Sequence, residues 1–256
     1  MVRRQLGRTG LTVSSVALGT TKLGRNTGVK YPADFTLPSD QEVATLLESA
    51  RQLGVNLIDT APAYGESERQ LSSFINNHRH EVVLCTKCGE QYLNGRSIYD
   101  FSAQAILASV EQSLRRLRTD HVDILLLHSD GNDVEILTQT DAVDTLSQLK
   151  KSGKIRAAGI SAKTKPGILE AARTLDVIMA PFSQKEPSLA EALAEVQDRG
   201  LGVLAIKGLF SGHLEAGPAI EFVLSQPFID ALVLGTIDPA HLAEAAVMAQ
   251  RVRGTN

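Results

Sequence analysis

The stretch VNLIDTAPAYGESE, residues 55–68, contains the structural unit from which the predicted fold is built. It begins with a short, mostly apolar run, which predicts a buried strand at 55–59 that ends at Asp59. A polar loop follows, and from residue 67 the apolar spacing becomes that of an amphipathic helix. The unit therefore places a carboxylate at the end of a strand and Tyr64 in the next loop.

The same unit repeats along the chain. Near-continuous apolar strands are typical of a parallel sheet that is covered on both faces by helices. Ser39 and Ser102 are suited to cap helix starts, and Gly54, Gly153 and Gly200 to end helices in the left-handed conformation. The expected strands cover 15–20, 55–59, 82–87, 122–128, 155–161, 176–180, 202–207 and 231–236, and the expected helices cover 39–54, 67–78, 102–118, 140–153, 165–175, 188–200, 217–226 and 238–252.

Eight such units in 256 residues predict an α/β fold, the closed (β/α)8 TIM barrel, as a single domain over 1–256. A β-hairpin is expected before it, formed by VRRQL at 2–6, a GRTG turn and LTVSS at 11–15. The alternative is an open doubly wound sheet, whose dinucleotide-binding form needs G-x-G-x-x-G after the first strand. The stretch ALGTTKLGRNTG at 17–28 lacks this motif, which favours the barrel.

Composition excludes several classes of function. The chain has 26 basic and 29 acidic side chains and a formal net charge of −3, so we expect no nucleic-acid partner. Polar residues follow Arg3 and Arg4 where a secretory signal needs an apolar stretch. The longest apolar runs, such as ILLL at 124–127, are far too short to span a bilayer. We therefore expect a soluble, cytoplasmic protein without a membrane contact.

The two cysteines, Cys85 and Cys88, have the spacing of a redox dithiol or of half a zinc site. In a strand, residues three apart lie roughly 10 Å from each other, too far for a disulfide. A structural zinc site usually needs four ligands, and the sequence offers no further cysteines or suitably spaced histidine pair. We therefore interpret both as ordinary thiols and expect no metal site.

Three of the expected strands end in polar residues: Asp59, Lys87 and His128. Taken singly, Asp59 could cap a turn, Lys87 could form a rim ion pair and His128 could be a core histidine. A TIM barrel, however, places its chemistry at the carboxyl ends of its strands. Together with Tyr64, these residues form a candidate proton relay in which Lys87 lowers the pKa of the Tyr64 phenol and Asp59 holds Lys87 in place. His128 would hydrogen-bond the substrate oxygen or share the proton with Tyr64.

These motifs resemble the aldo-keto reductase family over nearly the whole chain. VNLIDTAPAYGESE is similar to the family stretch that carries a catalytic Asp and Tyr, which correspond to Asp59 and Tyr64. VVLCTK carries the family lysine as Lys87, and LRRLRTDHVDILLLHSD carries its histidine as His128. The resemblance implies hydride transfer between an extended nicotinamide cofactor and a small-molecule carbonyl or alcohol, with Tyr64 as the proton donor in reduction.

The resemblance also implies cofactor-binding positions. Ser161 corresponds to a nicotinamide contact, although Ala162 and Met179 stand where many members have Asn and Gln. His241 stands where many NADPH-specific members have Arg, and an imidazole does not reproduce a bidentate guanidinium. NADP(H) is favoured over NAD(H) by family frequency alone. The expected cofactor-binding residues are Thr20, Asp59, Ser161, Lys207, Gly208, Leu209, Gly212, Gly235, Thr236, His241 and Glu244.

The substrate and the assembly stay open at this point. Long loops after the first and third strands supply Tyr31, Phe35, Tyr92 and Tyr99 as candidate pocket residues. A short carboxyl terminus leads us to expect a relatively open site, in a monomer or small homo-oligomer. Two other functions compete: an aldolase-like Schiff base at Lys87, and a nucleotide-binding sensor or docking module of the same fold with little turnover, because a fold does not guarantee activity.

Overall fold

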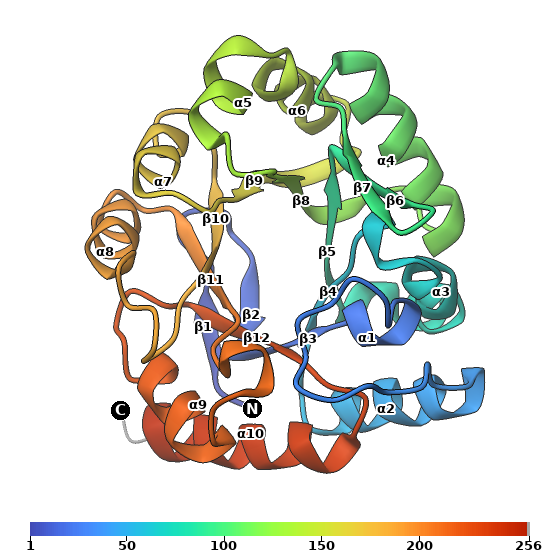
Figure 1. Cartoon of the computed structure of the whole chain (residues 1–256), viewed down its shortest axis with the longest axis vertical. Helices are drawn as coiled ribbons and strands as arrows, with labels where there is room; N and C mark the ends of the chain where they lie inside the picture. Colours follow the sequence, from blue (N-terminus) through green and yellow to red (C-terminus); the bar gives the residue numbers. More distant parts are fainter. Residues whose placement is uncertain (255–256) are drawn as a thin grey trace.

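The eight expected strands form a closed barrel in a computed structural model that describes residues 1–254. Every neighbouring pair in the barrel is parallel, as the uninterrupted apolar runs predicted. Figure 1 shows the strands surrounded by helices, which confirms the predicted fold class. In order around the barrel the strands are β3 (Val16–Gly19), β4 (Leu57–Asp59), β5 (Val83–Cys88), β8 (Val122–His128), β9 (Ile155–Ser161), β10 (Val177–Pro181), β11 (Gly202–Ile206) and β12 (Ala231–Gly235).

All eight expected helices are present. Ser39 caps the helix that begins at Asp40, in a reciprocal capping box with Glu42. Ser102 caps the helix that begins at Ala103. The glycines Gly54, Gly153 and Gly200 have φ of 77°, 76° and 91°, the left-handed conformation that was expected after helix ends. The helices are α2 (Asp40–Gln52), α3 (Ser67–His78), α4 (Ala103–Leu117), α6 (Ala142–Lys151), α7 (Lys165–Ala171), α8 (Ala190–Asp198), α9 (Ala216–Leu224) and α10 (Pro239–Arg253).

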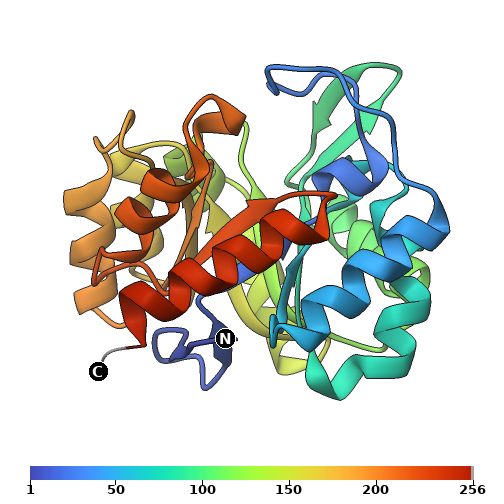
Figure 2. The ribbon, with the colours of Figure 1, turned by 90° about the horizontal axis from the view of Figure 1, so that it is seen from below.

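The predicted opening hairpin, β1 (Arg3–Gln5) and β2 (Thr12–Ser14), covers the amino-terminal end of the barrel. Leu6, Leu11 and Val13 are buried and belong to the same apolar cluster as the side chains inside the barrel. Figure 2 shows this hairpin at one end of the barrel, opposite the long loop after β3 and a second hairpin. The hairpin therefore closes one end, and only the carboxyl ends of the strands are left to form a site.

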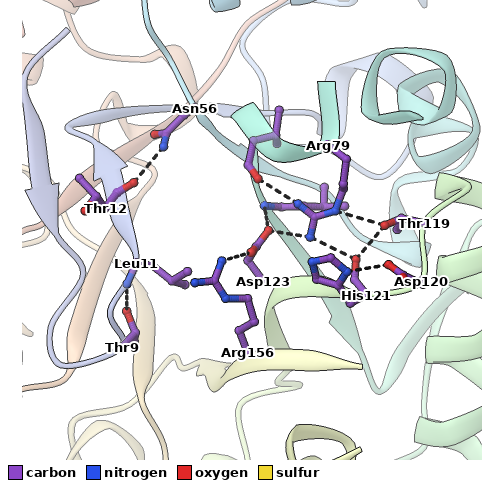
Figure 3. Close-up of polar contacts among 12 residues, drawn as sticks. Thr9, Leu11, Thr12, Asn56, Arg79, Thr119, Asp120, His121, Asp123 and Arg156 are labelled. Atoms are coloured by element: carbon purple, nitrogen blue, oxygen red, sulfur yellow. Dashed lines mark hydrogen bonds and ion pairs between the residues drawn. The ribbon is translucent and has the colours of Figure 1, made fainter. Parts of the chain in front are cut away.

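Asp123 organises the polar contacts near the closed end (Figure 3). Its carboxylate accepts a hydrogen bond from the Leu84 amide at 2.8 Å and contacts Arg79 and Arg156, each at 2.8 Å. Because Asp123 is only 1% exposed, these partners are required to offset the cost of burying its charge. The contacts join β5 to β8 and β9, which stabilises this end of the barrel.

Short elements that the sequence analysis treated as loops lie at the opposite end. The segment after β5 is not a loop but an antiparallel hairpin, β6 (Glu90–Leu93) and β7 (Arg96–Tyr99). Its turn residues, Asn94 and Gly95, both have positive φ, the conformation that an Asn-Gly hairpin turn requires. The other additions at this end are α1 (Thr21–Gly24), α5 (Asp133–Gln139) and the 3-10 turns η1 (Pro62–Tyr64) and η3 (Phe210–Gly212), whereas the 3-10 turn η2 (Arg79–Glu81) precedes β5 at the closed end.

Alternation along the strands decides which side chains enter the barrel. Cys85 belongs to the interior cluster, whereas Cys88 packs in the outer core between strands and helices. Both thiols are free and buried on β5, in agreement with their interpretation as ordinary thiols. Met179 is fully buried inside the barrel, so it acts as an apolar core residue.

Within residues 1–254, no helix is long and apolar enough to cross a membrane.

Candidate active site

The carboxyl ends of β4 and β5 bring Asp59 and Lys87 into direct contact. Lys87 Nζ donates hydrogen bonds to Asp59 Oδ1 at 2.6 Å and to the Thr60 carbonyl at 3.0 Å. Both side chains are almost completely buried, with 1% and 4% exposure. Burial alone would lower the pKa of Lys87, but the neighbouring Asp59 carboxylate raises it above its ordinary value. Lys87 is therefore held as an ammonium in a fixed orientation.

Tyr64 is placed beside this ion pair by a turn that only glycine can complete. Gly65 has a φ of 60°, and a Cβ there would come within 2.2 Å of the Gly24 carbonyl oxygen. A Cβ on Gly24 would in turn meet the Tyr64 carbonyl oxygen at 2.2 Å. The two glycines thus allow α1 to pack directly on η1, which fixes the backbone of Tyr64.

The Tyr64 ring lies between the lysine and the histidine. Lys87 Nζ is 4.7 Å from the ring centroid, and the His128 ring meets it edge-on at a centroid distance of 6.0 Å. Burial raises the pKa of Tyr64, and although Lys87 lowers it, burial together with Asp59 prevails. Lys87 therefore lowers the pKa of Tyr64, as expected, but the net shift of this pKa is upward. The phenol thus carries its proton at neutral pH.

His128 contacts a residue that the sequence analysis did not select. Its Nδ1 lies 2.7 Å from Oε2 of Glu90, at the start of β6. The two atoms are within ion-pair distance, but the contact lacks the alignment of a hydrogen bond, so the buried Nδ1 has no hydrogen-bond partner within residues 1–254. Burial lowers the pKa of His128, and Glu90 opposes this effect. The contacts with His128, Ser97 and Arg25 outweigh burial and lower the pKa of Glu90 to about 2.

Glu90 was missed because residues 88–101 were interpreted as a loop. The Asn94-Gly95 dipeptide between two short alternating segments was the available signal for a hairpin. Recognising it would have paired Glu90 with Tyr99 and placed the carboxylate next to the end of β5. No spacing within the sequence relates Glu90 to His128, because their contact depends on how the hairpin folds over the barrel.

Comparisons with known proteins agree with the fold. Residues 15–221 match the model of the aldo/keto reductase family. The chain belongs to the aldo/keto reductase family. Members of this family are oxidoreductases that use nicotinamide cofactors, and the match extends from the first barrel strand into α9.

Individual aldo/keto reductases support the assignment. L-galactose dehydrogenase from Arabidopsis thaliana is 34% identical over 84% of this chain and 68% of its own length. NADH-specific methylglyoxal reductase from Escherichia coli is 32% identical over 87% of this chain and 72% of its own length. A solved structure from Pseudomonas aeruginosa that is assigned to the family is 44% identical to this chain. The match covers 98% of this chain and 95% of that one, with a TM-score of 0.90.

Two of the positions expected to bind the cofactor, Ser161 and Thr20, differ in whether their hydroxyl groups already have a hydrogen-bond partner. Ser161 lies opposite His128 in the register of β8 and β9, and its hydroxyl forms no hydrogen bond within residues 1–254. The Thr20 hydroxyl, in contrast, donates to the Asp59 carbonyl at 2.8 Å and accepts from Ser67 at 2.7 Å. Thr20 is fully buried and fixes the backbone of Asp59, whereas the Ser161 hydroxyl is free to bind a ligand amide.

The turn after β11 carries four of the residues expected to bind the cofactor. Lys207 has a φ of 57° and Gly212 one of 93°, so this turn folds back on itself beside the strand end, with Gly208 and Leu209 between them. Burial, together with Lys30 and Lys163, lowers the pKa of Lys207, which places three ammonium groups near one another. Glu186 opposes this lowering, but no carboxylate within residues 1–254 forms a salt bridge with any of the three lysines, so the region keeps an excess of positive charge that suits an anionic ligand.

The loop after β3 reaches the same positions from the other side. A Cβ on Gly212 would lie 3.3 Å from Pro32, and one on Gly235 would lie 3.3 Å from the Tyr31 hydroxyl. Figures 1 and 2 agree in placing this loop and the turn after β11 at the same end of the molecule. Of the candidate pocket residues, Tyr31 and Phe35 contact each other edge-on at 5.6 Å, and Tyr92 lies 3.4 Å below the Arg25 guanidinium.

The expected adenosine positions lie at the junction of β12 and α10. Thr236 is nearly buried, and its hydroxyl accepts a hydrogen bond from the Asp238 amide and lies 3.4 Å from His241 Nδ1. His241 is 65% exposed, with Asp238 3.8 Å from Nε2. Glu244 is exposed on the next turn of α10. A phosphate at this place would meet one imidazole and a nearby carboxylate.

Proposed function

We propose that this protein is an NAD(P)H-dependent carbonyl reductase that interconverts an aldehyde or ketone and the corresponding alcohol, with Tyr64 as the proton donor in reduction. The observation that carries the proposal is the buried ion pair of Asp59 and Lys87, 2.6 Å apart, next to the Tyr64 ring. Membership of the aldo/keto reductase family supports the reaction class. The roles of the individual side chains follow from their contacts.

The Asp59–Lys87 ion pair keeps a positive charge fixed next to Tyr64. Tyr64 keeps its proton at neutral pH because burial raises its pKa, which is the form that reduction requires. As negative charge develops on the substrate oxygen, Tyr64 Oη can give up its proton and the Lys87 ammonium stabilises the phenolate that remains. In alcohol oxidation Tyr64 Oη takes the proton back. Asp59 keeps Lys87 charged and in place throughout.

The residues at the barrel mouth fit a nicotinamide dinucleotide. Ser161 would hold the carboxamide, and Lys207 with Gly208, Leu209 and Gly212 would hold the diphosphate in the positive region shared with Lys30 and Lys163. Gly235, Thr236, His241 and Glu244 would contact the adenosine half. When bound, this cofactor supplies or accepts the hydride. The protein contributes by orienting both reactants, because hydride transfer requires close contact.

The experiment is steady-state oxidation of NADPH and of NADH with a panel of small and bulky aldehydes and ketones. For Tyr64→Phe we expect kcat to fall by roughly 10²–10⁴-fold, the usual contribution of a general acid. Cofactor affinity, measured by fluorescence titration, should stay within about twofold, because only one hydroxyl is lost and none of the residues expected to bind the dinucleotide is changed. Unchanged turnover in Tyr64→Phe would exclude Tyr64 as the donor.

The same experiment separates the enzyme from a sensor or docking module. A wild-type protein that binds the dinucleotide tightly but reduces none of the carbonyl compounds would support the sensor instead. A Schiff base at Lys87 would be trapped by borohydride in the presence of a carbonyl substrate. We expect no such adduct, because Asp59 and Thr60 hold Lys87 as an ammonium, whereas a nucleophilic amine must be neutral.

A further inference from the structure

The proton transfer proposed for Tyr64 does not account for the contact between Glu90 and His128. Nδ1 of His128 is buried, and the distance of 2.7 Å to Glu90 Oε2 leaves no room for a water molecule between them. Glu90 itself is only 7% exposed. A buried carboxylate at this distance from an imidazole is costly unless the two groups interact directly.

Glu90 is held in this position by the hairpin that carries it. Ser97 Oγ donates to Glu90 Oε1 at 2.5 Å from the opposite strand, so only Oε2 is free to face the imidazole. Arg25 connects the hairpin to the neighbouring turn, with its guanidinium 3.4 Å from the Tyr92 ring and a hydrogen bond of 3.2 Å to the Ala63 carbonyl. Ala63 directly precedes Tyr64, so the hairpin and the tyrosine turn are joined.

The geometry determines which nitrogen of His128 carries a proton. An ionised carboxylate carries no proton, and an unprotonated nitrogen 2.7 Å from Glu90 Oε2 would bring two lone pairs into repulsive contact, so the nitrogen that faces Glu90 must be protonated. In a neutral imidazole the other nitrogen, Nε2, then has no proton and can only accept. Nε2 becomes a donor to a carbonyl oxygen only when the ring is an imidazolium, a form that the Glu90 carboxylate stabilises.

We propose that Glu90 is a positioning residue that fixes the tautomer and orientation of His128 and stabilises its protonated form, so that Nε2–H can donate to the substrate oxygen during reduction. This inference rests on the proposed carbonyl reductase activity. Glu90 acts through His128 and does not itself touch the substrate. The site thus contains two pairs of a carboxylate and a base, Asp59 with Lys87 and Glu90 with His128, on either side of Tyr64.

The charged groups around the pair determine the direction of the pH dependence. Lys87 and burial lower the pKa of His128, whereas Glu90 and Asp59 raise it. Arg25, Ser97 and the hairpin residue Tyr99 face Glu90, and Asp130 lies near Tyr99. Removing the Glu90 charge removes a group that raises the pKa of His128, so the imidazolium is lost at lower pH. In a variant without this charge, kcat/KM for reduction therefore begins to decline at a lower pH than in the wild type.

The test is Glu90→Gln, which keeps the size of the side chain and removes its charge. We expect kcat/KM for reduction at neutral pH to fall at least about tenfold, but by less than the roughly 10²–10⁴-fold expected for loss of a general acid. The pH at which kcat/KM declines should move downward. Histidine-selective ¹⁵N NMR of His128 should show the Nδ1–H tautomer in the wild type, and both tautomers in Glu90→Gln, because an amide can present either an oxygen or an NH2 group.

Two further variants distinguish this role from a purely structural one. Ser97→Ala should shift the pH profile in the same direction but less far, because it removes only the hydrogen bond that orients Glu90. In a His128→Ala background, Glu90→Gln should cause no additional loss, because a residue that acts through His128 has nothing left to act upon. Glu135→Gln, an exposed carboxylate on α5, is the matched control and should leave the profile unchanged.

Unchanged pH profiles and an unchanged tautomer in folded Glu90→Gln would overturn the inference. Equal additional losses with and without His128 would also contradict it, since Glu90 would then act by another route. A wild-type protein without turnover would instead contradict the proposed function. In that case the NMR titration of His128 in the cofactor-free protein still tests the inference independently.

Discussion

The two ends of the barrel use the same kinds of charged side chains in opposite ways. At the amino-terminal end, both oxygens of Asp123 have partners, from the Leu84 amide, Arg79 and Arg156 (Figure 3). At the carboxyl-terminal end, the Ser161 hydroxyl forms no hydrogen bond with any residue in 1–254, and its side chain is almost completely buried. A fully partnered network stabilises the fold, whereas an incomplete one keeps capacity to bind a ligand.

The difference follows from the topology of the barrel. The β1–β2 hairpin closes the amino-terminal end, so every buried polar group there must find a partner within the protein. The carboxyl-terminal end is bordered by the loop after β3, the β6–β7 hairpin and the turn after β11, which come from distant parts of the chain. Substitutions at the two ends should therefore differ in what they change, stability at one end and chemistry at the other.

Lys87→Met should give the largest effect on chemistry. Without the ammonium 4.7 Å from its ring, Tyr64 loses the group that lowers its pKa, so the pKa of Tyr64 rises further. We expect kcat to fall on the order of 10²–10⁴-fold, and any residual activity to show its pH profile shifted upward. The measurement is kcat across the pH range, with NADPH and NADH.

The control for Lys87→Met separates charge burial from catalysis. The single variant leaves the Asp59 carboxylate buried without its partner, which also destabilises the fold. The double variant Asp59→Asn with Lys87→Met removes both charges and should recover most of the lost thermal stability. It should recover none of the activity. Recovery of activity together with stability would show that the ion pair has only a structural role.

Asp123→Asn, at the closed end, should lower the stability of the fold and leave the chemistry unchanged. It removes the charge that Arg79 and Arg156 contact, and we expect a loss of about 3 kcal/mol of stability, the lower end for a broken buried pair because Arg156 is 53% exposed. The midpoint of thermal unfolding should fall by roughly 6–12 °C in a chain of this size. Below the transition, the pH profile of kcat should not change.

A neighbouring residue provides the matched control for Asp123→Asn. Asp120 is 94% exposed and its carboxylate lies 2.7 Å from the His121 ring, so Asp120→Asn removes the same charge from the same segment and leaves the direct contacts of Asp123 in place (Figure 3). Its midpoint should stay close to that of the wild type. A large change in the pH profile of Asp123→Asn, with little change in stability, would contradict the division between the two ends.

The sequence predicted the closed end and the strand ends well because both depend on local patterns. Apolar runs, serine caps and terminal glycines are read within a few residues of each other, and they placed all eight strands and all eight expected helices. The strand ends also predicted that Asp59, Lys87 and His128 lie at one end of the barrel, since parallel strands share their direction.

The rest of the site depends on contacts between segments that no local pattern relates. Glu90 reaches His128 only because the β6–β7 hairpin folds over the barrel end, and Tyr31 reaches Gly235 only through the path of a long loop. The net direction of the Tyr64 pKa is likewise set by burial, which depends on the packing of α1 against η1. Motif residues were predictable, and their immediate neighbours were not.

His241→Arg should give the smallest effect, at the exposed rim of the open end. A guanidinium can form two hydrogen bonds with a phosphate, so we expect the ratio of kcat/KM for NADPH to that for NADH to rise about tenfold, or about 1.4 kcal/mol. The gain stays modest because His241 is 65% exposed and Asp238 lies 3.8 Å away, where its carboxylate competes for the new cation.

Ionic strength and unfolding temperature complete this last test. The gain in selectivity should shrink as salt is raised from low to physiological concentration, because exposed charges are screened over about 8–10 Å. The midpoint of thermal unfolding should not move, since His241 supports no buried network. An unchanged cofactor ratio at low salt would mean that the ribose end of the cofactor does not lie at the start of α10, and that the open end binds its ligand mainly through the lysines near the turn after β11.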